Sequence, residues 1–163
     1  MKEDLLIREA VPGDLPVVQD LVQAAYQEFK PLMPEIAWGK WLASIEAAMG
    51  SPAGLLLVAE AGGQVQGVVK FFHEASQAAM GEWPQGAALI RILAVWPRTR
   101  GKGYGTRLTE ECLRRARSRQ IPTIFLYTGR FMLAAQHIYE KLGFRRVPEL
   151  DRDPGPIAYR LDL

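Results

Sequence analysis

The chain has 163 residues, of which 48% are hydrophobic and 23% are charged, and its formal net charge is +2. This composition predicts a single folded domain over residues 1–163 and argues against long disordered segments. The net charge is too small to indicate a nucleic-acid partner, and the single cysteine, Cys112, excludes an intrachain disulfide. No apolar run approaches the ~18 residues of a membrane-spanning helix, and MKEDLLIREA lacks a secretory signal, so a cytoplasmic protein is expected.

The first third of the chain predicts one strand followed by two helices. An apolar run at 5–9 predicts the strand, and Asp14 is a candidate N-cap for a helix that begins near residue 15. Apolar residues then follow the helical period as far as Phe29, where KPLMPE interrupts the pattern with prolines. A second helix is expected over roughly 36–49 and is stopped by GSPAG.

The middle of the chain changes to the period of strands. Two β-prone runs at 55–60 and 65–72 flank Gly62-Gly63, which is a strong hairpin signal. Residues 75–86 are predicted to form a loop. The nearly continuous apolar run at 87–97 is typical of a strand that is buried on both faces.

The last third predicts two helices and three strands. A helix should run to about residue 119, TIFLYT (123–128) is typical of a buried strand, and a helix is expected over 131–143. Two closing strands are predicted at 144–147 and 157–163. The order β-α-α-β-β-β-α-β-α-β-β indicates an α/β domain with a mixed, mainly antiparallel sheet of about seven strands and helices on both faces. The strand–helix alternation after residue 87 implies a parallel portion reached by right-handed crossovers.

The stretch RTRGKGYGTRL (98–108) places Gly101, Gly103 and Gly105 at alternate positions among basic residues. Each glycine costs a helix ~1 kcal/mol relative to alanine, yet a helix begins here. A strand that leads through glycines into a helix can bind an anion, because the first amides of the helix lack partners and carry the positive end of its dipole. Arg100, Lys102 and Arg107 would add charge at the rim. A glycine-rich turn before a solvated basic helix is the alternative, and neither the dinucleotide pattern nor the P-loop pattern is met.

Two motifs resemble one known family. IRILAVWPRTRGKGYGTRL (90–108) is similar to the acyl-CoA signature of the GCN5-related N-acetyltransferase (GNAT) superfamily, and AAQHIYEKLGF (134–144) resembles its last helix and the strand that follows. The resemblance covers essentially the whole chain and implies one GNAT-type domain that uses acetyl-CoA as co-substrate and no metal. It implies that the strand before the glycines splays from 123–128 and receives the pantetheine arm, while the pyrophosphate binds the glycine-rich amides. The implied cofactor-binding residues are Leu93, Ala94, Val95, Arg100, Gly101, Lys102, Gly103, Tyr104, Gly105 and Thr106.

The same resemblance implies that Tyr139 donates a proton to the sulfur of coenzyme A; the alternative is an aromatic core residue. A general base is harder to identify, because Leu89, Tyr127 and Met132 stand where many relatives carry glutamate or asparagine. A base acting through water would then come from one of three other residues, each more often an ordinary loop or strand residue: His73, Glu74 and Glu82. A substrate amine of low pKa would need no strong base.

The acceptor side is expected to lie between the first two helices and the hairpin. The candidate substrate-binding residues are Tyr26, Phe29, Trp38, Arg91 and Tyr127, with Trp41 as a further aromatic candidate. Aromatic residues at helical spacing are more often core residues. Arg91, within an apolar strand, either lines the acceptor pocket or pairs with a structural carboxylate.

Other conspicuous residues have simpler interpretations. His137 is expected on the surface and Cys112 in the core. The arginines from Arg114 to Arg119 are expected on a solvated face, with Glu110–Arg114 and Glu111–Arg115 at i,i+4 spacing, although some could reach the 3′-phosphate of coenzyme A.

These observations predict transfer of the acetyl group of acetyl-CoA to a primary amine of a small molecule or peptide, by direct attack in a ternary complex. The alternative is a catalytically weak or inactive domain that binds acyl-CoA as a sensor or partner module. A DNA-binding arginine face is a third hypothesis, which the near-neutral total charge disfavours. No nucleic-acid or membrane partner is expected, and the resemblance allows a homodimer through the sheet edge or the C-terminal strands.

Overall fold

The computed structural model describes residues 4–153 and 155–163, and its elements follow the predicted order. The helices are α1 (Leu15–Tyr26), α2 (Glu35–Gly50), α3 (Tyr104–Ser118) and α4 (Leu133–Lys141). The strands are β1 (Leu5–Glu9), β2 (Leu55–Ala61), β3 (Gln64–Phe72), β4 (Ala88–Val95), β5 (Thr123–Thr128), β6 (Arg145–Arg146) and β7 (Ile157–Asp162). No helix in these described ranges is long and apolar enough to cross a membrane.

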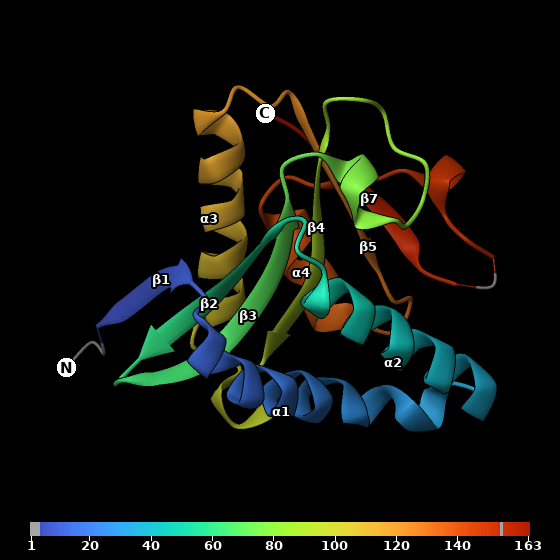
Figure 1. Ribbon diagram of the computed structural model, residues 1–163. Helices are drawn as coiled ribbons and strands as arrows, with labels where there is room; N and C mark the ends of the chain where they lie inside the picture. The colour runs from blue at the N-terminus through green and yellow to red at the C-terminus, as the bar shows by residue number, and fades with distance from the viewer. Residues whose placement is uncertain (1–3, 154) are drawn as a thin grey trace.

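The strands form one seven-stranded sheet in the order β1-β2-β3-β4-β5-β7-β6 (Figure 1). β4 and β5 pair in parallel, and the other neighbours pair antiparallel. The predicted mixed, mainly antiparallel sheet is therefore confirmed. Gly62 and Gly63 join β2 to β3 with φ values of +60° and +75°, as a two-residue hairpin of the glycine-favouring kind requires.

Helices cover both faces of the sheet. On one face, α3 and α4 bury residues such as Leu108 and Tyr139 against the strands. On the other face, α1 and α2 bury residues such as Leu21 and Ile45. In Figure 1, α1 and α2 run together in front of the sheet while α4 lies behind the strands. This arrangement confirms the predicted layers and explains why the apolar runs of β3 and β4 are nearly continuous.

Three local predictions differ from the structure. Phe29 does not continue the first helix but lies in a 3₁₀ segment, Gln27–Leu32, which contains Pro31. Asp14 precedes α1 without capping it; its carboxylate accepts a hydrogen bond from the Val11 amide instead. The strand predicted at 144–147 shortens to β6, because Pro148 cannot donate to a strand ladder.

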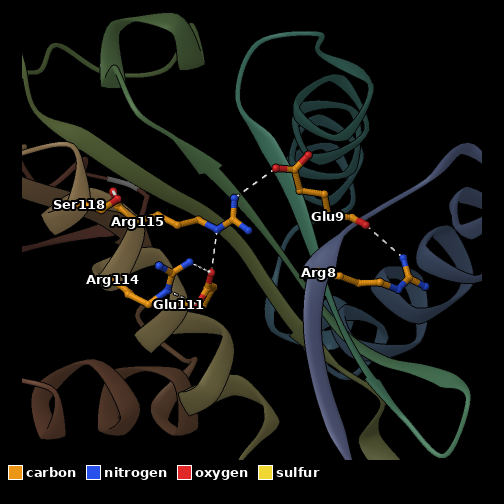
Figure 2. Close-up of polar contacts among 6 residues, drawn as sticks. All are labelled: Arg8, Glu9, Glu111, Arg114, Arg115 and Ser118. Carbon is orange, nitrogen blue, oxygen red and sulfur yellow. Dashed lines mark hydrogen bonds and ion pairs between the residues drawn. The ribbon is translucent and has the colours of Figure 1, made fainter.

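The arginines of α3 are only partly a solvated face (Figure 2). Glu111 forms the predicted pair with Arg115 at 2.9 Å, but Arg114 also pairs with Glu111, at 2.6 Å, and not with Glu110. Arg115 then reaches Glu9 on β1 at 3.2 Å and so joins α3 to the first strand. Glu110 instead pairs with Arg107 at 3.7 Å. The two predicted i,i+4 pairs therefore reduce to one, because the less exposed Glu111 serves both arginines.

Candidate active site

The sheet opens between β4 and β5. These strands pair only from Ala88 to Ile90, which face residues 124–126, and no pair joins the rest of β4 to β5. A bulge lies at the same place: Leu93 pairs with Val69 and Arg91 with Lys70, so Ile92 is the extra residue, with φ +59°. A bulge bends a strand and increases its local twist, which turns the end of β4 away from β5 while its pairing with β3 continues. The edge of β4 that faces β5 is thus left without a partner strand after Ile90, as the resemblance implies.

A pocket of about 680 Å³ lies at this opening, within the size range of cofactor sites. It is enclosed by the end of β4, the start of α3, the end of α1 with the segment after it, and α4 with the loop before it. The lining residues are Ala25, Tyr26, Glu28, Phe29, Leu93, Ala94, Val95, Thr99, Arg100, Gly101, Gly103, Tyr104, Gly105, Thr106, Phe131, Met132, Leu133, Ala134, Ala135, His137, Ile138 and Lys141. Nine of the ten predicted cofactor-binding residues are among them, and Lys102 is not.

The start of α3 presents backbone amides to the pocket. The first bond of this helix runs from the Arg107 amide to the Gly103 carbonyl, so the amides of residues 103–106 precede the helical ladder. Gly101 and Gly103 have φ values of +85° and +86°, which side-chain-bearing residues rarely adopt. Gly105 serves another purpose, because a Cβ there would lie 3.1 Å from the Ile138 side chain of α4. The glycines thus shape the turn and bring α3 close to α4.

Of the three basic residues predicted to surround the glycines, only Arg100 lines the pocket. Its guanidinium pairs with Glu28 at 2.6 Å and donates to the Ala25 carbonyl at 3.1 Å, which ties the turn to the end of α1. Lys102 and Arg107 do not line the pocket. The fully charged cations in the lining are therefore Arg100 and Lys141, and an anion bound there would also meet the amides and dipole of α3.

Tyr26 lies where α1 meets the open end of β4. Its hydroxyl donates a hydrogen bond to the Leu93 carbonyl at 3.3 Å, and its burial raises the pKa of the phenol. Its ring packs on Trp41 with centroids 4.9 Å apart, and Trp41 contacts Phe131 at 6.4 Å. Phe29 completes this aromatic wall at 5.2 Å from Phe131.

Tyr139 lies on the buried face of α4. Its side chain packs against Phe144 and Tyr159, and only 4% of the residue is exposed. Burial raises the pKa of its phenol, and the nearby Tyr26 phenol contributes in the same direction. No hydrogen bond joins its hydroxyl to another residue in the described part of the chain. Its neighbour Ile138 lines the pocket, whereas Tyr139 itself is not among the lining residues.

The other predicted acceptor residues lie outside the lining. Trp38 is a core residue beside Trp41. The Tyr127 hydroxyl donates to the Leu150 carbonyl at 2.9 Å. Arg91 donates to the Ser44 hydroxyl, and no carboxylate among residues 4–153 and 155–163 pairs with it, so the structural-carboxylate alternative is wrong.

The suggested bases also lie elsewhere. His73, Glu74 and Glu82 do not line the pocket, and Glu74 accepts bonds from Ser76 and the Gly86 amide. Of the lining residues, only Glu28 carries a carboxylate, and Arg100 holds it.

Some lining residues were not anticipated from the sequence. His137 is exposed, as predicted, but it faces the pocket together with Lys141. Ala134, Ile138 and Lys141 recur at the spacing of one helix face, which is the signal that could have identified this wall. Phe131 and Met132 precede α4, where no periodicity applies.

The chain matches the family described as the acetyltransferase (GNAT) family over residues 15–144. Among curated proteins, it is 38% identical to a mycothiol acetyltransferase of Cellulomonas flavigena over 96 residues, which cover 58% of this chain and 27% of that protein. It is 27% identical to a mycothiol acetyltransferase of Pseudarthrobacter chlorophenolicus over 164 residues, which cover 96% of this chain and 47% of that protein. The chain thus spans less than half the length of these relatives.

Solved structures share the fold. A PaiA N-acetyltransferase of Thermoplasma acidophilum in complex with coenzyme A superimposes with a TM-score of 0.75 at 17% identity, covering 98% of this chain and 99% of that one. A GNAT acetyltransferase of Brucella melitensis in complex with acetyl-CoA gives a TM-score of 0.66 at 22% identity, covering 99% of this chain and 90% of that one.

Proposed function

The chain belongs to the acetyltransferase (GNAT) family, and we propose that it transfers the acetyl group of acetyl-CoA to a primary amine, acting as a single domain. One observation carries the proposal: the left-handed glycine turn at the start of α3 and the edge of β4 that has no partner strand after Ile90 open into the same pocket. The first suits a pyrophosphate and the second suits the amides of a pantetheine arm. The two features therefore fit the two ends of one acyl-CoA molecule.

In this proposal the donor binds along a continuous backbone surface. The pyrophosphate accepts hydrogen bonds from backbone amides at the start of α3, directly after the left-handed turn at Gly101 and Gly103. The pantetheine arm pairs with the edge of β4 from Leu93 to Val95, where β5 no longer pairs with that strand. Both interactions use main-chain groups, which need no side-chain rearrangement on binding.

The reaction itself is direct attack. The neutral amine nitrogen attacks the thioester carbonyl, a C–N bond forms, the C–S bond breaks, and the amine proton is ultimately passed to the thiolate. We assign the proton donation to Tyr139, whose raised phenol pKa keeps it protonated at neutral pH. Support comes from its position on α4, directly after Ile138, which lines the pocket.

The amine must lose a proton before attack. A lysine-like amine with a pKa of ~10.4 is only ~0.1% neutral near pH 7.4, a cost of ~4 kcal/mol. Because the lining carboxylate Glu28 is already held by Arg100, the proposal favours acceptors of lower pKa or deprotonation through water.

The paired state of Glu28 also favours a second candidate function, an acyl-CoA-binding sensor that does not turn over. Calorimetry with acetyl-CoA, followed by measurement of free coenzyme A released against a panel of amines, separates the two. Binding with amine-dependent release supports the enzyme, and binding without release from any amine supports the sensor. Absence of binding contradicts both.

A further inference from the structure

Arg91 is a partly buried cation with no anionic partner. It lies on β4 at the point where the strand leaves β5, and its guanidinium donates to the Ser44 hydroxyl of α2. A guanidinium carries five donors, and a charge removed from water requires a partner of opposite sign. No ion pair supplies one within the described ranges 4–153 and 155–163. Its cross-strand neighbour Lys70 differs, because the Lys70 amine donates to the Ser51 carbonyl at the end of α2, 2.8 Å away.

A second guanidinium, that of Arg152, lies near the same opening: Ile90 and Leu126 are the last paired residues of β4 and β5, Arg91 follows Ile90, and Tyr127, which lies under Arg152, follows Leu126. Arg152 lies over the Tyr127 ring, 5.7 Å from its centroid, while Tyr127 anchors the same loop through the Leu150 carbonyl. Arg130 donates to the Arg152 and Gly155 carbonyls and so fixes the loop from the other side. Burial and the positive charge of Arg152 both lower the pKa of Arg91. Two cations thus lie near this opening, and no carboxylate in the described ranges pairs with either of them.

Arg91 is not a lining residue, but it is close in the chain to residues that line the pocket. Arg91 is two residues before Leu93, whose carbonyl receives the Tyr26 hydrogen bond, and its partner Ser44 is three residues after Trp41 on α2. Two residues of a strand span only ~6.6 Å. The aromatic wall of Tyr26, Trp41 and Phe131 lies on the same side of the opening.

We propose that the acceptor is an amino acid with an apolar or aromatic side chain, whose carboxylate is bound by Arg91 and Arg152. The proposal rests on the proposed acetyl transfer and names its substrate class. The carboxylate supplies the charge that the two guanidiniums lack, and the side chain packs on the aromatic wall. The amine is then placed near Leu93, where the thioester would lie.

The test compares ligand pairs that differ only in the carboxylate. Phenylalanine with phenethylamine, and leucine with isopentylamine, are assayed by coenzyme A release. Their N-acetylated products are titrated by calorimetry with and without coenzyme A. The proteins are wild type, Arg91→Gln, Arg152→Gln and the matched control Arg117→Gln, which removes an exposed arginine of α3 outside the pocket lining.

Wild type should favour the acid of each pair by about 10-fold to 100-fold, since a charge-assisted hydrogen bond contributes about 1.5–3 kcal/mol. Arg91→Gln should remove most of this preference, while its rate of coenzyme A release with the carboxylate-free amine stays within about twofold of the wild-type rate. Arg152→Gln should remove part of the preference. Arg117→Gln should match wild type.

The assignment would be overturned if wild type releases coenzyme A equally fast with the acid and the amine. It would also be overturned if Arg91→Gln slows release with both by the same factor. Failure of acetyl-CoA to bind would instead contradict the proposed function. In that case the titrations without coenzyme A still test the carboxylate site. If the N-acetylated acid binds no more tightly than the N-acetylated amine, the site is rejected.

Discussion

The Tyr26 hydroxyl donates a hydrogen bond to the Leu93 carbonyl across 3.3 Å and so joins the end of α1 to β4 where the sheet opens. The two residues are far apart in the sequence, and both line the pocket. This contact holds the end of α1 against the strand that, in the proposed function, binds the donor.

Replacement of Tyr26 by Phe tests whether this hydrogen bond serves acceptor binding or donor binding. The ring contacts with Trp41 and Phe29 remain, but the Leu93 carbonyl loses its partner, so the free energy of unfolding should fall by about 1 kcal/mol. The KM for the acceptor should rise several-fold while calorimetry with acetyl-CoA gives an unchanged Kd. A weakened acetyl-CoA affinity with an unchanged acceptor KM would show that Tyr26 serves the donor instead.

Gly103→Val should disrupt the proposed pyrophosphate site. The left-handed φ of +86° at Gly103 is strained for valine, and relief of the strain turns the following amides away from the pocket. Gly86→Val is the matched control, since Gly86 has φ +83° and a Cβ there also meets nothing within 4 Å. Both variants should lose comparable thermal stability, but only Gly103→Val should lose acetyl-CoA affinity, by at least about 10-fold. Tight acetyl-CoA binding by Gly103→Val would refute the site.

Tyr139→Phe tests proton donation. The Tyr139 hydroxyl bonds to none of the residues that the structure describes, so its removal should leave the stability nearly unchanged. The kcat should fall by about 100-fold or more with an unchanged Kd for acetyl-CoA. Tyr159→Phe is the control: it removes a hydroxyl bonded to Glu140 at 2.8 Å, outside the pocket lining, and should lower stability without changing kcat. An unchanged kcat in Tyr139→Phe leaves Tyr139 as a core residue.

Asp14 should contribute stability that depends on pH. Hydrogen bonds from Arg8, at 2.7 and 3.1 Å, hold the pKa of this carboxyl below its usual 3.8. The stabilisation is therefore complete above pH 3.8 and is lost as the pH falls through the lower folded-state pKa. Urea unfolding at pH 7 should show Asp14→Asn less stable by about 1–3 kcal/mol, with the difference shrinking in acid.

The exposed Asp20→Asn variant controls for the loss of one carboxylate on the same segment. It should unfold like wild type at both pH values. A difference between Asp14→Asn and wild type that stays constant from neutral to acid pH would contradict the assigned role of the Arg8 pair.

Much of the fold was predictable because its signals are local. The Gly62-Gly63 turn, the periodicity of α1 and the apolar run of β4 each depend on neighbours in the sequence, and each is confirmed. The glycine-rich start of α3 belongs to the same class, since a left-handed turn before a helix is encoded by glycine itself. Pro148, which begins the 3₁₀ turn after β6, is a local signal of the same kind.

The sequence by itself determined the order of elements, the two-sided burial of the sheet and the glycine turn before α3, because propensity, periodicity and glycine conformation act over short distances. Tertiary structure alone decided which charges are free. Arg100, expected at the rim of the anion site, is held by Glu28, whereas Arg91, which had two open interpretations, lacks a carboxylate partner in the described chain. Such pairing depends on segments that meet only when the sheet is assembled, and no local pattern encodes it.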